Sequence, residues 1–326
     1  MEDVKFEKNR RQVYLDEESY HNTIEQLVAE NAVPPPPDQA PLDKCMDLRL
    51  AAQQNWFMFQ LHYTAGMSLS RLADMMDDVV LSHELWIVAL DDLDDDDYYA
   101  PFRMNDMIDT YVDYLNMLSA AILLRRADLV PRICAFNEGT EFDGIDAVLE
   151  ELCKMFLPDR PWLDYLLWKK QYEKLLDVVD SDTPEEMAAE MQIHVKKWYP
   201  SMKGKAHFWG KHEEIEPEFT PYCGYWAMCA GAFTYLLDID DTSYRNETVY
   251  PKDLVDYARS IPRDQDLHQA ISARPLRVAG GERCTKSGLW FTTAHTDRQT
   301  RFRDDELMPN FQDTPYGPTI WQWGSD

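Results

Sequence analysis

The stretch that decides the fold is residues 68–90, SLSRLADMMDDVVLSHELWIVAL. Its apolar positions alternate steps of three and four, a spacing that gathers side chains on one face of an α-helix. The positions of this stripe are Leu69, Leu72, Met76, Val79, His83, Trp86 and Leu90. We therefore expect one long helix here, packed along its whole length against other helices.

Similar stripes on both sides of this helix predict further helices. They include residues 20–27, 46–61, 111–122 and 145–156, and proline-containing start signals at Thr183-Pro184 and Thr220-Pro221 mark two more. After about residue 274, glycines and prolines separate short aromatic and β-branched runs, a pattern typical of an antiparallel sheet. The predicted fold class is mainly α: a multi-helix bundle with a small antiparallel β appendage at the C-terminus.

We divide this fold into three predicted parts. Residues 1–140 form an N-terminal helical domain, 141–273 a C-terminal helical domain and 274–326 a small β-rich tail. The charged residues 1–11 lack the apolar run of a secretory signal, and no stretch approaches the length of a membrane span. We therefore expect a cytoplasmic protein that does not bind membranes.

Charge and cysteine usage narrow the function classes. The formal net charge of -27 repels nucleic acid and anionic lipid over most of the surface, whereas a cationic protein would be attracted. The six cysteines form no C-x-x-C pair, so buried reduced thiols are favoured over disulfides or zinc. They are Cys45, Cys134, Cys153, Cys223, Cys229 and Cys284.

The densest polar feature is an aspartate run followed by two tyrosines. Its residues are Asp91, Asp92, Asp94, Asp95, Asp96, Asp97, Tyr98 and Tyr99. A calcium loop is disfavoured because Asp97 stands where the tight turn needs glycine and Arg103 where a glutamate should bind the ion. A solvated loop between two helices remains the plain interpretation.

An all-α magnesium enzyme is a further alternative for this run. Asp91-Asp92-x-x-Asp95 resembles the aspartate motif of terpenoid synthases, whose carboxylates hold magnesium against a diphosphate. Such enzymes need a second metal cluster on a distant helix. The nearest imitation, Asn105-Asp106-x-x-Asp109-x-x-x-Asp113, lies almost adjacent in sequence and lacks the expected hydroxyl and glutamate.

Two other acidic segments are expected to be exposed. The first contains Glu213, Glu214, Glu216 and Glu218, and the second contains Asp238, Asp240 and Asp241. Nucleotide-binding loops and H-E-x-x-H are missing from the sequence, and no histidine is assigned a catalytic role. We therefore expect no enzyme activity, no catalytic residue, no metal and no cofactor.

A resemblance to a known family rests on the segments 222–228, 230–232, 238–241 and 250–257, which include Tyr222-Cys223-Gly224-Tyr225-Trp226-Ala227-Met228. Together these resemble the C-terminal domain of the PoNi-type immunity proteins of bacterial polymorphic toxin systems. Residues 63–72 are similar to the helical N-terminal portion of that family. Cys229 departs from the pattern, since a glutamate is expected there in many relatives.

The resemblance implies an immunity protein that binds and neutralises a cognate secreted toxin, often a nuclease and often delivered by type VI secretion. A nuclease presents lysines and arginines to phosphates, so an inhibitor can offer carboxylates to the same groups. Lasting inhibition also needs desolvated anchors, for which Tyr98 and Tyr99 are candidates. The proposed contact residues are all those of the aspartate run and of the two acidic segments.

Two points stay open at this level. An acidic interaction protein for a basic regulator, or an all-α magnesium-dependent diphosphate enzyme using Asp91, Asp92 and Asp95, are the alternative functions. The toxin, the acidic surface that touches it, the role of the tail and a homodimer are likewise undecided.

Overall fold

A computed structural model describes residues 3–31, 39–93, 99–263, 277–292, 299–311 and 319–325. Helices dominate these residues and a small sheet follows them, which confirms the predicted fold class. The helices are α1 (Asp3–Asn9), α2 (Glu17–Asn31), α3 (Pro41–Ala65), α4 (Leu69–Asp91), α5 (Ile108–Leu123), α6 (Val130–Cys134), α7 (Ala147–Cys153), α8 (Lys169–Asp180), α9 (Pro184–Ser201), α10 (Met228–Leu236) and α11 (Lys252–Ser260).

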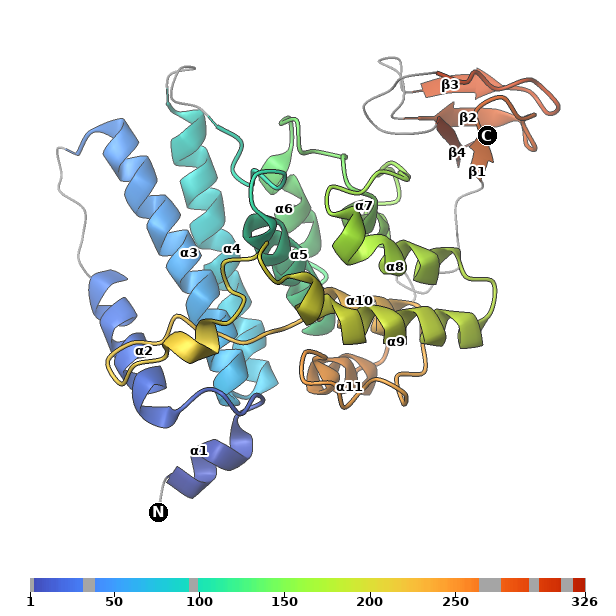
Figure 1. Ribbon diagram of the computed structural model, residues 1–326. Helices are drawn as coiled ribbons and strands as arrows, with labels where there is room; N and C mark the ends of the chain where they lie inside the picture. The colour runs from blue at the N-terminus through green and yellow to red at the C-terminus, as the bar shows by residue number, and fades with distance from the viewer. Residues whose placement is uncertain are drawn as a thin grey trace.

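The predicted long helix is α4, which packs antiparallel against α3 (Figure 1). Most of its predicted stripe is buried, including Leu72, Met76 and Trp86. The turn between the two helices contains Gly66 with φ +96°, in the left-handed region that glycine tolerates. A side chain there would also meet the backbone of Asn9.

Helix α5 runs through the middle of the helical body (Figure 1). Its stripe of Tyr111, Leu115, Leu118 and Ile122 is buried as predicted, and so are most of its other residues. It packs against α10, which in turn contacts α11. Gly231 lets α10 lie close to the start of α11, because an added Cβ would lie 2.8 Å from Cγ of Pro251.

The predicted helix start at Thr220-Pro221 is wrong, since α10 begins only at Met228. The intervening backbone is fixed by Gln12, a buried side chain near the N-terminus. Gln12 donates to the carbonyl oxygens of Tyr225 (2.9 Å) and Thr248 (2.8 Å) and accepts from the amide of Tyr225 (2.8 Å). With Gly224 at φ +115°, these tertiary bonds override the local helix signal.

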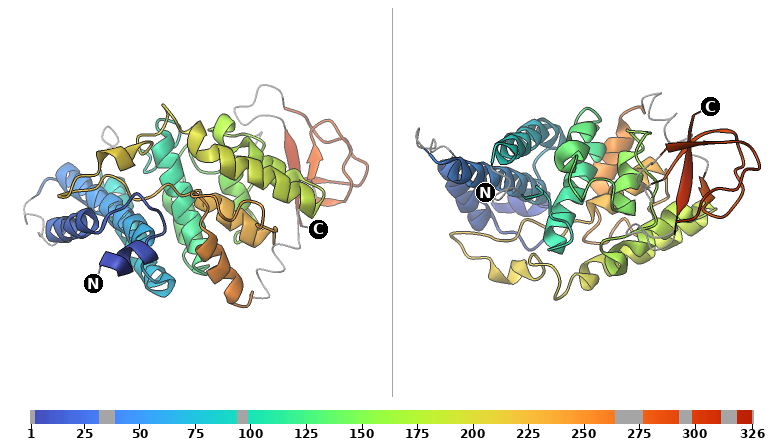
Figure 2. Two further views of the ribbon diagram at one scale, coloured as in Figure 1. Left: turned by 60° about the horizontal axis from the view of Figure 1, so that its bottom comes forward. Right: turned by 90° about the horizontal axis from the view of Figure 1, so that it is seen from above.

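The sheet contains β1 (Arg277–Ala279), β2 (Gly288–Phe291), β3 (Gln299–Phe302) and β4 (Ile320–Ser325), all antiparallel in the order β1-β4-β2-β3. It has its own small core around Trp290 and Trp321, separate from the core of the helices. The sheet and helices α1 to α4 lie at opposite ends of the molecule (Figures 1 and 2). The domain boundaries at residues 140 and 273 stay predictions.

Two other features bear on the sequence analysis. All six cysteines are free, and all are buried except Cys223, which is half-buried. None of the described helices combines the length and the apolar character that crossing a bilayer requires.

Candidate functional site

The aspartate run begins at the C-terminal end of α4. Asp91 is the last residue of this helix and Asp92 follows it, and both are exposed. Asp94, Asp95, Asp96, Asp97 and Tyr98 lie outside the described residues. Tyr99 is half-buried against α3, where Arg49 lies 5.6 Å from its ring centroid.

The second acidic segment is an exposed turn. Glu213 and Glu214 end a 3-10 turn (Lys211–Glu214), and Glu216 and Glu218 follow in a tight loop; all four are exposed as expected. Asn22 of α2 holds this loop by donating to the carbonyl oxygen of Pro217 at 2.9 Å.

The third acidic segment divides into two environments. Asp238 and Asp240 are exposed, but Asp241 is only 4% exposed, so its predicted exposure is wrong. Its carboxylate pairs with Arg245 at 2.9 Å and Arg259 at 3.3 Å, and it accepts the hydroxyl of Tyr250 at 3.0 Å. Asp241 is buried because it joins the loop after α10 to α11.

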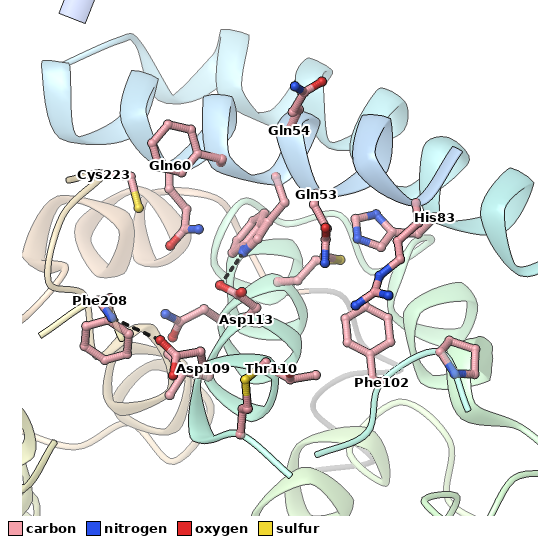
Figure 3. Close-up of a pocket in the computed structure, with 18 of the residues that line it drawn as sticks. Gln53, Gln54, Gln60, His83, Phe102, Asp109, Thr110, Asp113, Phe208 and Cys223 are labelled. Carbon is pink, nitrogen blue, oxygen red and sulfur yellow. Dashed lines mark hydrogen bonds between the residues drawn. The ribbon is translucent and has the colours of Figure 1, made fainter. Parts of the chain in front are cut away.

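A cavity of about 810 Å³ lies between α3 and α5 (Figure 3). Side chains from α2 and α4, the segment 99–107, Trp198 of α9 and the segment 208–226 complete its wall. The wall combines aromatic rings with amides and carboxylates. Those used below are Gln53, Gln60, Trp56, Phe57, Phe102, Asp109, Asp113 and Phe208.

Two carboxylates one helical turn apart on α5 face this cavity. Asp109 accepts the backbone amides of His207 and Phe208, both at 3.0 Å, and thereby holds the segment after α9 against α5 (Figure 3). Asp113 accepts the indole N–H of Trp56 at 3.0 Å. Asp109 thus links α5 to the segment after α9, and Asp113 links α5 to α3.

The side chain of Asp113 is half-buried, and it forms part of the cavity wall. Loss of hydration, together with the nearby charge of Asp109, raises the pKa of its carboxyl group from 3.8 to about 7, partly offset by hydrogen bonds from Trp56 and Gln60. Both of these neighbours are neutral. Among the described residues, no arginine, lysine or histidine pairs with Asp113.

His83 forms part of the far wall and has a structural environment. Its ring stacks on Phe102 and Phe136, with centroids 5.7 and 5.5 Å away, and its Nδ1 donates to the carbonyl oxygen of Val79 at 2.7 Å. Burial lowers the pKa of His83 to about 4, so the ring is neutral at pH 7. Burial likewise lowers the pKa of His194, to about 3.

The aspartates of the second candidate metal cluster, in residues 105–113, make other contacts. Asp106 pairs with Arg103 at 2.9 Å, and Asp109 caps the backbone of 207–208. The part of the chain that the structure describes contains no group of three or more side chains placed to hold a metal. Asp95, the third member of the set Asp91, Asp92 and Asp95, lies outside that part.

Sequence reasoning missed the cavity. The sequence pattern around Asp109 and Asp113 suggests only metal ligands, and Trp56, which binds Asp113, lies 57 residues away along the chain. The four-residue spacing of the two aspartates on an otherwise apolar helix was the available signal, since such a pair must face one side of the helix.

Comparison with known proteins adds information on fold and family. The chain is similar to the solved structure of protein PA2201 from Pseudomonas aeruginosa, with a TM-score of 0.61 and 18% identity over 77% of this chain and 91% of that one. This likeness concerns the fold alone. A search of curated proteins gives no match.

The family comparison covers the second half of the helical body. A sequence model for the C-terminal region of the PoNe immunity proteins (PoNi) matches residues 144–254, from the loop before α7 into α11. This range includes the aromatic segment 222–228, on which the predicted resemblance largely rested. The predicted resemblance is therefore confirmed over residues 144–254, which are similar to the C-terminal region of the PoNi-type immunity proteins.

Proposed function

We propose that this protein binds a cognate PoNe-type toxin and neutralises it by covering the toxin's active surface. The observation that carries this proposal is the PoNi match over residues 144–254. Inhibition of this kind requires tight complex formation and no turnover by the inhibitor. The protein therefore acts as a binding partner and not as an enzyme.

The charge of the chain supports a basic toxin, of which a nuclease is the leading case. A nuclease must attract phosphates, and the formal charge of -27 attracts the same cationic surface while repelling nucleic acid and anionic lipid. Placement in the cytoplasm fits this role, because a nuclease threatens its producer there. Delivery of the toxin by type VI secretion belongs to the same proposal.

The proposed contact surface contains the exposed carboxylates described above. They are Asp91, Asp92, Glu213, Glu214, Glu216, Glu218, Asp238 and Asp240. The half-buried Tyr99 belongs to the same proposal, as do Asp94, Asp95, Asp96, Asp97 and Tyr98, which lie outside the described residues. Asp241 is withdrawn from this set because its carboxylate is already paired inside the protein. The end of α4 adds exposed apolar side chains beside Asp91, namely Leu85 and Val88 at 50% and 60% exposure.

Coexpression with the toxin encoded beside this gene tests the proposal. We expect cells to survive the toxin only when this chain is present, and the two proteins to purify together as a complex that weakens as salt rises. A catalytically inactive toxin serves as the control for complex formation. Survival without a complex, or full lethality despite expression of this chain, would refute the proposal.

A further inference from the structure

The wall of the cavity between α3 and α5 contains a carboxylate, Asp113, that pairs with no cation among the described residues. Asp109 accepts backbone amides and Asp106 pairs with Arg103. Glu30 accepts the side-chain amides of Gln26 and Gln54. Asp113 receives only neutral donors. A carboxylate in a poorly hydrated site gains most from a cation that enters the same site.

The wall around Asp113 suits a particular kind of cation. Gln53 and Gln60 extend from α3 toward Asp113 on α5, and each carries an amide oxygen that can accept a hydrogen bond (Figure 3). Trp56, Phe57 and Phe208 supply aromatic surface for an apolar stem or a flat cationic group. A guanidinium group meets both demands because it is planar and has five N–H donors.

The two arginines in the cavity wall, Arg49 and Arg103, lie against groups other than Asp113. Arg49 lies over the rings of Trp86 and Tyr99, at 5.9 and 5.6 Å from their centroids. Arg103 pairs with Asp106. Arg49 therefore lies against aromatic rings and Arg103 against another carboxylate, and neither pairs with Asp113.

We propose that this cavity receives an arginine side chain of the bound partner, with Asp113 as the counter-ion inside it. The choice of partner rests on the proposed function, whereas the recognition of a guanidinium rests on the cavity alone. The volume of about 810 Å³ exceeds what one side chain needs, so the residues flanking the arginine also enter the mouth. Such a buried charged anchor is a typical hot spot of a protein interface.

The first experiment uses the purified full chain and two small probes. N-acetylarginine amide carries the guanidinium, and N-acetylcitrulline amide is its neutral isostere. We expect calorimetry to show binding of the arginine probe only, and the indole N–H resonance of Trp56 to shift with it. Equal behaviour of the two probes, or no binding of either, would overturn the inference.

Asp113→Asn is the matched variant, because it keeps the shape and the acceptor for Trp56 but removes the charge. We expect this variant to bind the arginine probe at least about tenfold more weakly, which corresponds to about 1.4 kcal/mol. Asp74→Asn changes the same charge on the exposed surface of α4, outside the cavity, and should leave the affinity unchanged. Equal losses in both variants would reduce the effect to overall charge and reject the site.

A gain-of-function variant keeps the test independent of the folding of Asp113→Asn. Gln53→Glu adds a further carboxylate to the wall and should tighten binding of the arginine probe while leaving the citrulline probe unaffected. Unchanged or weaker arginine binding by this folded variant would count against the inference.

The second experiment separates this inference from the proposed function. In the complex with the toxin, Asp113→Asn should raise the dissociation rate at least about tenfold, since loss of a buried charge partner acts on dissociation. If the variant and the parent release the toxin equally, the cavity is not the arginine site, although neutralisation stands. If the parent fails to neutralise the toxin, the proposed function falls, whatever the probes show.

Discussion

The acidic turn at 213–218 and the acidic loop at 238–241 look alike in sequence but differ in the structure. Every glutamate of the turn is exposed, whereas the loop buries Asp241 between Arg245 and Arg259. Exposed carboxylates remain available to a partner, and a buried, paired one holds the fold. The difference depends on where the arginines lie, with Arg259 reaching Asp241 from α11.

The largest expected effect is on the buried member of this comparison. Asp241→Asn removes the charge that balances Arg245 and Arg259, and it should lower the free energy of unfolding by about 3 kcal/mol, as for a broken buried ion pair. Urea denaturation measures this loss. Asp240→Asn is the control at the adjacent exposed position and should change stability by less than about 0.5 kcal/mol. Similar losses of stability in the two variants would show that burial and pairing do not set Asp241 apart from Asp240.

A smaller effect is expected at Asp113, which lies between these two extremes. Its pKa is raised from 3.8 to about 7 in the folded chain, so the folded state binds this proton more tightly than the unfolded state does. Stability therefore falls as pH rises from 3.8 to about 7, and Asp113→Asn removes that part of the fall. At about pH 8 the free energy of unfolding of the variant should exceed that of the parent by at least about 1.4 kcal/mol, the equivalent of one pKa unit.

Denaturation of parent and variant at about pH 5 and pH 8 measures this difference directly. The comparison between the two proteins cancels the other titrating groups, His83 and His194 among them. A stability difference that is the same at both pH values would show that Asp113 titrates normally.

The smallest effect on stability is expected at the exposed turn. Converting Glu213, Glu214, Glu216 and Glu218 together to glutamine should change the free energy of unfolding by less than about 0.5 kcal/mol. Association with a basic toxin should slow about threefold or more, with a weaker dependence on salt. Stopped-flow mixing at two salt concentrations measures both. An unchanged association rate would remove this turn from the proposed contact surface.

Local periodicity predicted the parts of the fold that depend on one helix face. The stripes of residues 68–90 and 111–122 correspond to α4 and α5, because burying such a face is the main source of helix stability. The predicted helix start at Thr220 failed because Gln12, more than two hundred residues earlier, binds this backbone. Periodicity carries no information about such a distant partner.

The candidate site was harder to predict than the fold. Family resemblance located the aromatic segment 222–228, and charge predicted the kind of partner. The cavity escaped notice because Trp56, Asp113 and Phe208 come from three distant segments, which only tertiary contacts to α5 bring together. The burial of Asp241 escaped notice for the same reason, since Arg259 belongs to the next helix.

The contacts of Arg11 and Gln12 also determine when the molecule can be completed during synthesis. Arg11 pairs with Asp253, and Gln12 binds Tyr225 and the carbonyl oxygen of Thr248. Arg11 and Gln12 leave the ribosome long before α11 and must wait for it to emerge before these polar groups are satisfied. Contacts of such long sequence separation form slowly and late, so this part of the nascent chain closes only after α11 has been translated.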